Sequence, residues 1–155
     1  MVSLILNSTK GSVLDNELEG GNCDAKVTTV LLVEDTEDNR LMMKRLLEMS
    51  GFRVVEALNG KEAIRLASEV RPQIILMDLS LPFVDGISAT RQIRELPGLS
   101  TVPIVVVSAH DTADFHSLAR AAGCNAYVTK PIHYPELEAV VKGLLAGETL
   151  DNSSA

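Results

Sequence analysis

Ile74-Ile75-Leu76-Met77-Asp78 is the stretch that decides the fold, because four consecutive apolar residues end abruptly on a carboxylate. Short continuous apolar runs are typical of parallel strands that are buried on both faces of a sheet. Three further runs end in the same way, each on a different kind of polar residue: Val30–Val33 before Glu34-Asp35, Ile104–Val107 before Ser108, and Ala126–Thr129 before Lys130-Pro131. The chain should therefore contain a parallel sheet whose strand ends present carboxylates, a hydroxyl and an ammonium group.

Helical patterns separate these runs, and residues 53–57 add one more short strand. Apolar residues recur every three or four positions over residues 36–50, 61–70, 86–96, 111–122 and 135–144. Asp111 is expected to cap the fourth of these helices and Pro135 to open the fifth. Two helix faces are expected to turn inward, Met42, Met43, Leu46, Leu47 and Met49 in the first helix and Phe115, Leu118, Ala119 and Ala122 in the fourth. The alternation predicts five βα units.

Composition limits the function classes. The chain has 155 residues, of which 46% are hydrophobic, and this suffices for one packed domain. A net charge of −7 argues against binding to nucleic acid or to an anionic membrane. The sequence contains neither a membrane-spanning run nor a secretory signal, and Cys23 and Cys124 form no paired motif, so a cytoplasmic setting is expected. We expect a flexible leader over residues 1–26, a folded domain over 27–146 and a short tail over 147–155.

The strand ends indicate what the site can do. In an open α/β sheet, ligands bind outside the carboxyl ends of the strands. Carboxylates can hold a hard cation such as Mg²⁺, and an ammonium group can hold a phosphate. A carboxylate that lies between them can itself be phosphorylated.

These residues resemble the receiver domain of two-component response regulators, over about residues 27–145. The resemblance rests on motifs in the expected order: Leu32-Val33-Glu34-Asp35, Met77-Asp78-Leu79-Ser80-Leu81-Pro82, Asp85-Gly86, Val107-Ser108-Ala109 and Tyr127-Val128-Thr129-Lys130-Pro131. It implies a flavodoxin-like, doubly wound, five-stranded parallel sheet of order 2-1-3-4-5 with five helices. It also implies phosphorylation of the Asp that ends the third strand.

The resemblance assigns roles to individual residues. Asp78 is expected to be the phosphoacceptor, and Lys130 to pair with it at rest and then to neutralise the incoming phosphoryl group. Mg²⁺ is expected to bind Asp35 and Asp78 directly, Glu34 through water, and the backbone carbonyl of Ser80. The Lys130–Pro131 peptide bond is expected to be cis.

The same resemblance predicts a switch and its partners. Ser108 is expected to donate its hydroxyl to the phosphoryl group, and Tyr127 to act as the switch aromatic of the output face. The phosphoryl donor would be a histidine kinase or a histidine phosphotransfer protein, docked through Asn39, Met42 and Ile132. Output would act through a downstream protein that the sequence does not name.

Four other functions are to be compared with this one. A magnesium-dependent phosphatase of the haloacid-dehalogenase class also uses an Asp at a strand end, but it requires a second acid two positions later, where this chain has Ser80. A flavodoxin-like ligand-binding module is disfavoured because the acidic loop after Val33 lacks glycine. The complete site argues against a degenerate scaffold, whereas a receiver fragment of a hybrid histidine kinase stays open. We therefore expect a phosphoacceptor with slow self-catalysed dephosphorylation and not a turnover enzyme.

Overall fold

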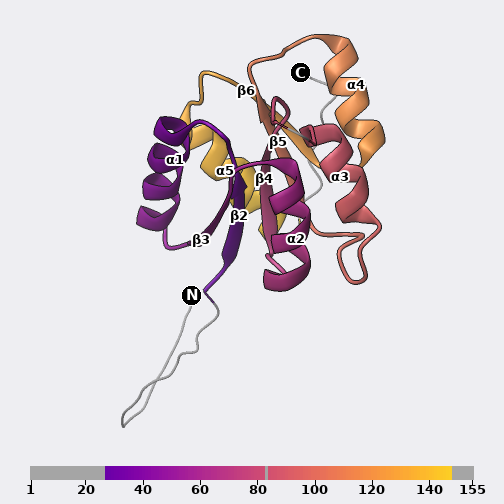
Figure 1. Ribbon diagram of the computed structural model, residues 1–155. Helices are drawn as coiled ribbons and strands as arrows, with labels where there is room; N and C mark the ends of the chain where they lie inside the picture. Colours follow the sequence, from indigo (N-terminus) through magenta and orange to yellow (C-terminus); the bar gives the residue numbers. More distant parts are fainter. Residues whose placement is uncertain (1–26, 83, 148–155) are drawn as a thin grey trace, which may run out of the picture.

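The computed structural model describes residues 27–82 and 84–147. The predicted leader over residues 1–26 and nearly all of the predicted tail lie outside these residues. Strands and helices alternate through the described part of the chain (Figure 1). The strands are β2 (Thr29–Val33), β3 (Arg53–Ala57), β4 (Ile74–Asp78), β5 (Ile104–Ser108) and β6 (Ala126–Thr129), and the helices are α1 (Glu37–Met49), α2 (Gly60–Val70), α3 (Gly86–Arg94), α4 (Ala113–Ala122) and α5 (Tyr134–Leu145).

The five strands form one sheet of order β3-β2-β4-β5-β6, and every neighbouring pair is parallel. Numbered along the chain from β2, this order is 2-1-3-4-5, and the predicted doubly wound topology is confirmed. Val33 lies opposite Met77, so that the residues following β2 and β4 leave the sheet side by side. Ser108 at the end of β5 lies opposite Thr129, which places Lys130 at the same edge.

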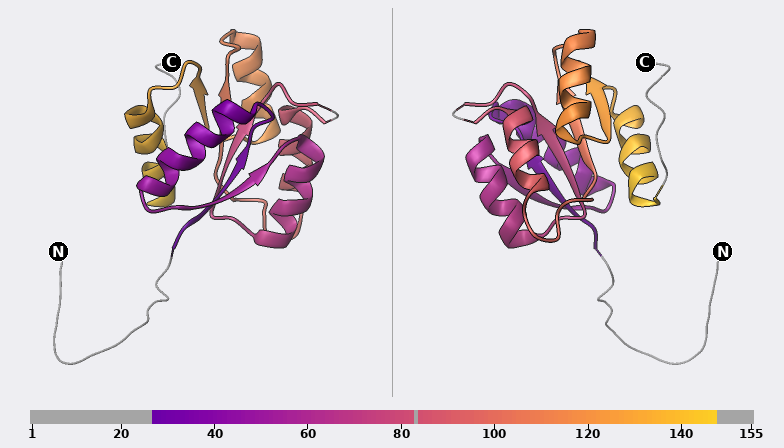
Figure 2. Two further views of the ribbon diagram at one scale, coloured as in Figure 1. Left: turned by 60° about the vertical axis from the view of Figure 1, so that its left-hand side comes forward. Right: turned by 90° about the vertical axis from the view of Figure 1, so that its right-hand side faces the viewer.

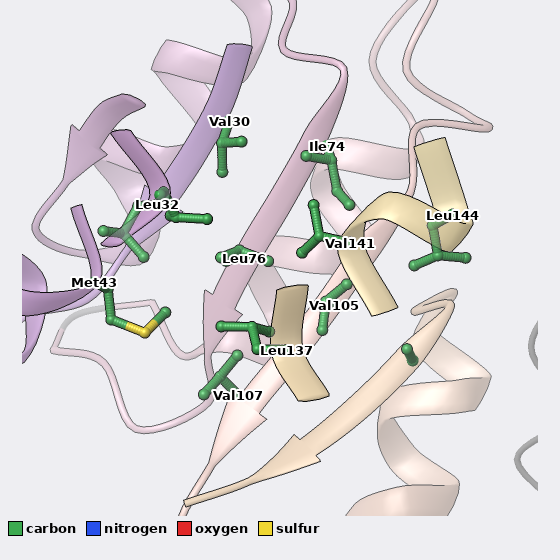
Figure 3. Close-up of a cluster of buried hydrophobic side chains, with 12 residues drawn as sticks. Val30, Leu32, Met43, Ile74, Leu76, Val105, Val107, Leu137, Val141 and Leu144 are labelled. Atoms are coloured by element: carbon green, nitrogen blue, oxygen red, sulfur yellow. The ribbon is translucent and has the colours of Figure 1, made fainter. Parts of the chain in front are cut away.

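Helices cover both faces of the sheet (Figure 2), and alternate residues of the central strands belong to different core clusters. Leu32, Leu76 and Val105 belong to a core cluster that α1 and α5 cover (Figure 3). Leu31, Ile75 and Ile104 belong to a second cluster, which α2 and α3 cover. A smaller third cluster joins Leu79, Val106 and Ala119 of α4. Because both faces are covered, the central strands β2, β4 and β5 carry four successive apolar residues each, whereas the edge strand β3 also carries Arg53 and Glu56.

The inner face of α1 is narrower than the sequence pattern predicts. Met43 and Leu47 are buried, whereas Met42 is 48% exposed and Met49 is 77% exposed. Met43 and Leu47 lie four residues apart on one line, while Met49 is turned by about 200° from Leu47 around the helix. The expectation that all five apolar residues of this helix turn inward is therefore wrong.

Two predictions for α4 are also wrong. The helix begins at Ala113, so its N-cap is Thr112, whose side chain accepts a hydrogen bond from the Phe115 N–H. Asp111 lies one residue too early to cap and instead contacts the ring of His116. Leu118 is 46% exposed, whereas Ala119 and Ala122 of the same helix are buried and Phe115 packs against the third cluster.

Candidate functional site

The carboxyl ends of β2 and β4 bring three carboxylates together. Glu34 and Asp35 directly follow β2, and Asp78 is the last residue of β4. One carboxylate oxygen from each residue lies within 4.8 Å of the other two. Glu34 and Asp78 are 4% and 6% exposed, whereas Asp35 is exposed. The group is therefore open to solvent on one side only, the side of Asp35.

Lys130 supplies the positive charge of this edge. Its Nζ lies 3.0 Å from Oε1 of Glu34 and 3.6 Å from Oδ2 of Asp78. The predicted partner Asp78 is thus within reach, but Glu34 is the nearer one and accepts the hydrogen bond. The Lys130–Pro131 peptide bond is cis, as the resemblance implied.

Backbone groups fix the orientation of the two buried carboxylates. Asp78 Oδ1 accepts a hydrogen bond of 3.1 Å from the Ser80 N–H, and Glu34 Oε2 accepts one of 3.2 Å from the Thr36 N–H. Gly86, the first residue of α3, packs so closely against the Asp78 carbonyl oxygen that a Cβ atom there would overlap it. The start of α3 therefore packs directly against the end of β4 that carries Asp78, and only glycine fits at position 86.

The balance of charge at the site favours a cation. Burial, and then the charge of Glu34, raise the pKa of Asp78 from its ordinary value of 3.8 to about 6, against the opposing effect of Lys130. Burial alone would lower the pKa of Lys130, but the hydrogen bond that Lys130 donates to Glu34 and the charges of Glu34 and Asp78 raise it, so the ammonium group stays charged. One ammonium group thus contacts only two of the three carboxylates, and a divalent cation would relieve the repulsion among the three.

Ser108 and Tyr127 connect this edge to α4. Ser108 is fully buried, and its Oγ accepts a hydrogen bond of 3.0 Å from the His110 N–H. Tyr127 of β6 donates its hydroxyl to the His110 backbone carbonyl over 2.6 Å. His110 also links two loops, because its Nε2 lies 3.1 Å from Oγ of Ser80.

Sequence reasoning missed the histidines in this region. The sequence pattern assigns no role to them, but His110 stacks on Phe115 and His116 on Tyr127. Neither histidine has a partner at a regular spacing that a pattern could reveal, since His116 meets Tyr127 across two elements. Only the packing of α4 against β6 brings His116 next to Tyr127.

The predicted docking residues lie on α1 and after the cis-proline. Asn39 and Ile132 are half-buried, and Met42 is exposed. Ile132 packs against the core cluster under α5. The outer side of α1 has an open apolar groove of about 310 Å³, lined by Leu41, Met42, Arg45, Leu46 and Met49.

None of the helices in residues 27–82 and 84–147 has the length and apolar content that a membrane crossing requires.

Known proteins resemble this chain over most of its described residues. A family model described as the response regulator receiver domain matches residues 30–142. The polar-differentiation response regulator DivK of Brucella anthropi is 37% identical over 117 residues, which are 76% of this chain and 95% of that protein.

Solved structures agree with the sequence relatives. A LuxR-family two-component response regulator from Aurantimonas sp. SI85-9A1 superposes with a TM-score of 0.75 at 36% identity, covering 83% of this chain and 92% of that one. The receiver domain of a sensor histidine kinase from Pseudomonas aeruginosa PAO1 has a TM-score of 0.74 at 34% identity, covering 78% of this chain and 99% of that one. That structure holds a magnesium ion coordinated in its active-site cleft.

Proposed function

The chain belongs to the response regulator receiver family, and we propose that it is a switch controlled by phosphorylation of Asp78. One observation carries the proposal: the Asp78 carboxylate lies between two further carboxylates and the Lys130 ammonium group, within 4.8 Å of the former and 3.6 Å of the latter. A family member of this kind is a signalling domain, and we expect self-catalysed hydrolysis of the phosphoryl group but no turnover of a separate substrate.

The residues present fit Mg²⁺, because a hard cation prefers oxygen ligands and usually binds one or two carboxylates. Asp35, Asp78 and the Ser80 carbonyl would bind it, and Glu34 would assist through water. When bound, the ion screens the carboxylates and holds the phosphoryl oxygens. The magnesium ion in the cleft of the Pseudomonas receiver domain supports this assignment.

The protein's own groups perform the transfer. An Asp78 carboxylate oxygen attacks the phosphorus of a phosphohistidine, the phosphorus–nitrogen bond breaks, and the histidine nitrogen leaves with its electron pair and takes a proton. Lys130 turns from Glu34 towards the transferred group, and Ser108 donates its hydroxyl to a phosphoryl oxygen. Water later attacks the same phosphorus, which releases phosphate and restores the Asp78 carboxylate.

Labelling with acetyl phosphate and Mg²⁺, followed by intact-mass measurement, tests the assignment of Asp78. The wild type should gain one phosphoryl group, and Asp78→Asn should gain none. Asp85→Asn is a matched control, since Asp85 is an exposed residue of the following loop that caps α3. Equal labelling of Asp78→Asn and the wild type would refute the proposal, as would a loss in Asp85→Asn that matches the loss in Asp78→Asn.

We propose further that a histidine kinase or histidine phosphotransfer protein docks over the start of α1 and the segment after Lys130. Asn39, Met42 and Ile132 flank the path to Asp78, and the exposed Met42 and Leu41 add apolar surface. Changing Asn39 and Ile132 together should slow transfer from the protein donor and spare labelling by acetyl phosphate. Equal slowing in both assays would contradict a docking role.

Residues 27–146 form the receiver unit in this proposal, which acts in the cytoplasm and signals to a downstream protein. The likeness to the receiver domain of a sensor histidine kinase also supports a second candidate, in which the same unit is part of a hybrid kinase. Asp78 would perform the same chemistry in either setting.

A further inference from the structure

The ring of Tyr127 is held on its face as well as at its hydroxyl. The ring of His116, from α4, stacks on it with a centroid distance of 3.8 Å and an angle of 18° between the planes. The hydroxyl at the end of the Tyr127 ring donates a hydrogen bond to the His110 carbonyl. Two elements, α4 and the loop that follows Ser108, therefore fix one side chain of β6.

His116 is itself anchored. Its Nε2 lies 2.9 Å from Oδ1 of Asp111, and because an ionised carboxylate only accepts hydrogen bonds, this nitrogen carries a proton. The same Asp111 oxygen accepts a hydrogen bond of 3.3 Å from the hydroxyl of Thr129, two residues after Tyr127. The contacts close a ring from Tyr127 to His116, Asp111, Thr129 and back along β6.

This docked arrangement of Tyr127 also orients Ser108. The His110 carbonyl is bound by Tyr127, and the His110 N–H binds the Ser108 Oγ. Because Ser108 already accepts this hydrogen bond, its own hydroxyl proton is left to donate elsewhere, as a phosphoryl group on Asp78 would require. Docked Tyr127 and a donating Ser108 are thus parts of one loop conformation.

We infer that His116, anchored by Asp111, is the positioning residue that keeps Tyr127 docked on the loop after Ser108 and so couples Asp78 to the α4–β6 surface. The coupling rests on the proposed function, whereas the docking of Tyr127 does not. An aromatic stack of this kind corresponds to about a three- to tenfold change in the ratio of docked to undocked Tyr127.

Fluorine NMR of protein labelled with 3-fluorotyrosine tests the docking. The chain has two tyrosines, and Tyr134, whose hydroxyl contacts Ser50 and the Leu46 carbonyl on the far face of the sheet, serves as an internal control. His116→Ala should move the Tyr127 resonance and leave that of Tyr134 in place. His116→Phe keeps an aromatic face and should restore most of the shift. Ser117→Ala, an exposed neighbour on α4, should change neither resonance.

Titration with beryllofluoride in the presence of Mg²⁺ tests the coupling. If only the docked form binds the phosphoryl mimic well, His116→Ala should raise the half-saturating concentration by up to about three- to tenfold. Asp111→Ala, which removes an exposed anchor and should fold normally, should give a smaller rise in the same direction. His116→Phe should lie nearer to the wild type.

The outcomes separate the two claims. An unchanged Tyr127 resonance in both His116→Ala and Asp111→Ala would overturn the docking role of His116. A moved resonance with unchanged half-saturation would overturn the coupling to Asp78. If the wild type binds no beryllofluoride and accepts no phosphoryl group, the proposed function fails, and the fluorine spectra without the mimic still decide whether His116 positions Tyr127.

Discussion

The two ends of the sheet satisfy their polar groups in opposite ways. At the amino-terminal ends of β5 and β6, Arg94 of α3 donates to the backbone carbonyls of Leu99, Val102 and Gly123 over 2.6 to 3.1 Å, and to the side chain of Asn125 over 2.9 Å. One cation there serves several neutral acceptors. At the carboxyl ends, one cation, Lys130, contacts Glu34 and Asp78, two of a group of three carboxylates.

This difference separates stability from function. The Arg94 end is complete within the protein, because Nε, Nη1 and Nη2 of Arg94 all have acceptors and these acceptors carry no charge. The Asp78 end holds excess negative charge in a buried place, which costs folding free energy until a cation or a proton arrives. Ligand-dependent behaviour should therefore be confined to the carboxyl ends, and mutations at the two ends should shift stability in opposite directions.

The largest change in stability should come from mutation of Arg94, at the amino-terminal ends of β5 and β6. Arg94→Ala removes the hydrogen bonds to three backbone carbonyls at once and should lower the free energy of unfolding by about 3 kcal/mol. Urea unfolding measures this loss. Arg91→Ala, an exposed arginine one turn earlier in the same helix, is the control and should change stability by less than about 0.5 kcal/mol. Similar losses in the two variants would remove the contrast between the ends.

At the opposite end, a mutation should stabilise the protein. The pKa of Asp78 is raised to about 6 from 3.8, so the folded state holds its proton more tightly than the unfolded chain does. The favourable contribution is complete below about pH 4 and is lost as the pH rises through about 6. Without Mg²⁺ at pH 7.5, Asp78→Asn should therefore be more stable than the wild type by about 2 to 3 kcal/mol.

The pH dependence distinguishes this effect from simple repacking. An Asn side chain still accepts the hydrogen bond from the Ser80 N–H, and Lys130 keeps Glu34 as its partner. The stability difference between Asp78→Asn and the wild type should shrink towards zero as the pH falls to about 4. A difference that stays constant from pH 4 to 7.5, measured by urea unfolding, would show that the charge of Asp78 is not its cause. Asp85→Asn should give no such pH dependence.

The fold was predictable because its signal is local and repeated. Each buried strand, as in residues 74–78, is a continuous apolar run, and each ends where the side chains of the site begin. The same property predicts that Glu34, Asp35, Asp78, Ser108 and Lys130 lie at one edge of the sheet, where the structure places them. The buried faces of the helices were less predictable. Apolar residues such as Met49 and Leu118 lie on the surface, and their residue type does not distinguish them from buried ones.

Contacts between side chains and distant backbone could not be predicted. Arg94 looks like any surface arginine in the sequence, because its acceptors are mostly carbonyls, which every residue has. The preference of Lys130 for Glu34 over Asp78 depends on a fraction of an ångström at the strand ends. The stack of His116 on Tyr127 depends on how α4 sits on the sheet, which no periodic pattern encodes.

The smallest predicted effect is stabilisation of the fold by Mg²⁺. The ion should offset the charge repulsion at the carboxyl ends of the strands, whereas Arg94 stabilises the amino-terminal ends without any ligand. At ten times an assumed millimolar Kd, a cation that binds only the folded state raises the free energy of unfolding by about 1.4 kcal/mol. Asp35→Asn should weaken this gain, because Asp35 is the exposed carboxylate on the open side of the cluster. Asp38→Asn changes an exposed acid of the first turn of α1 and should retain the gain. Thermal unfolding with and without Mg²⁺ measures both variants. The same gain in Asp35→Asn as in the wild type would place the cation away from the three carboxylates, and the charge imbalance between the two ends would then have no part in metal binding.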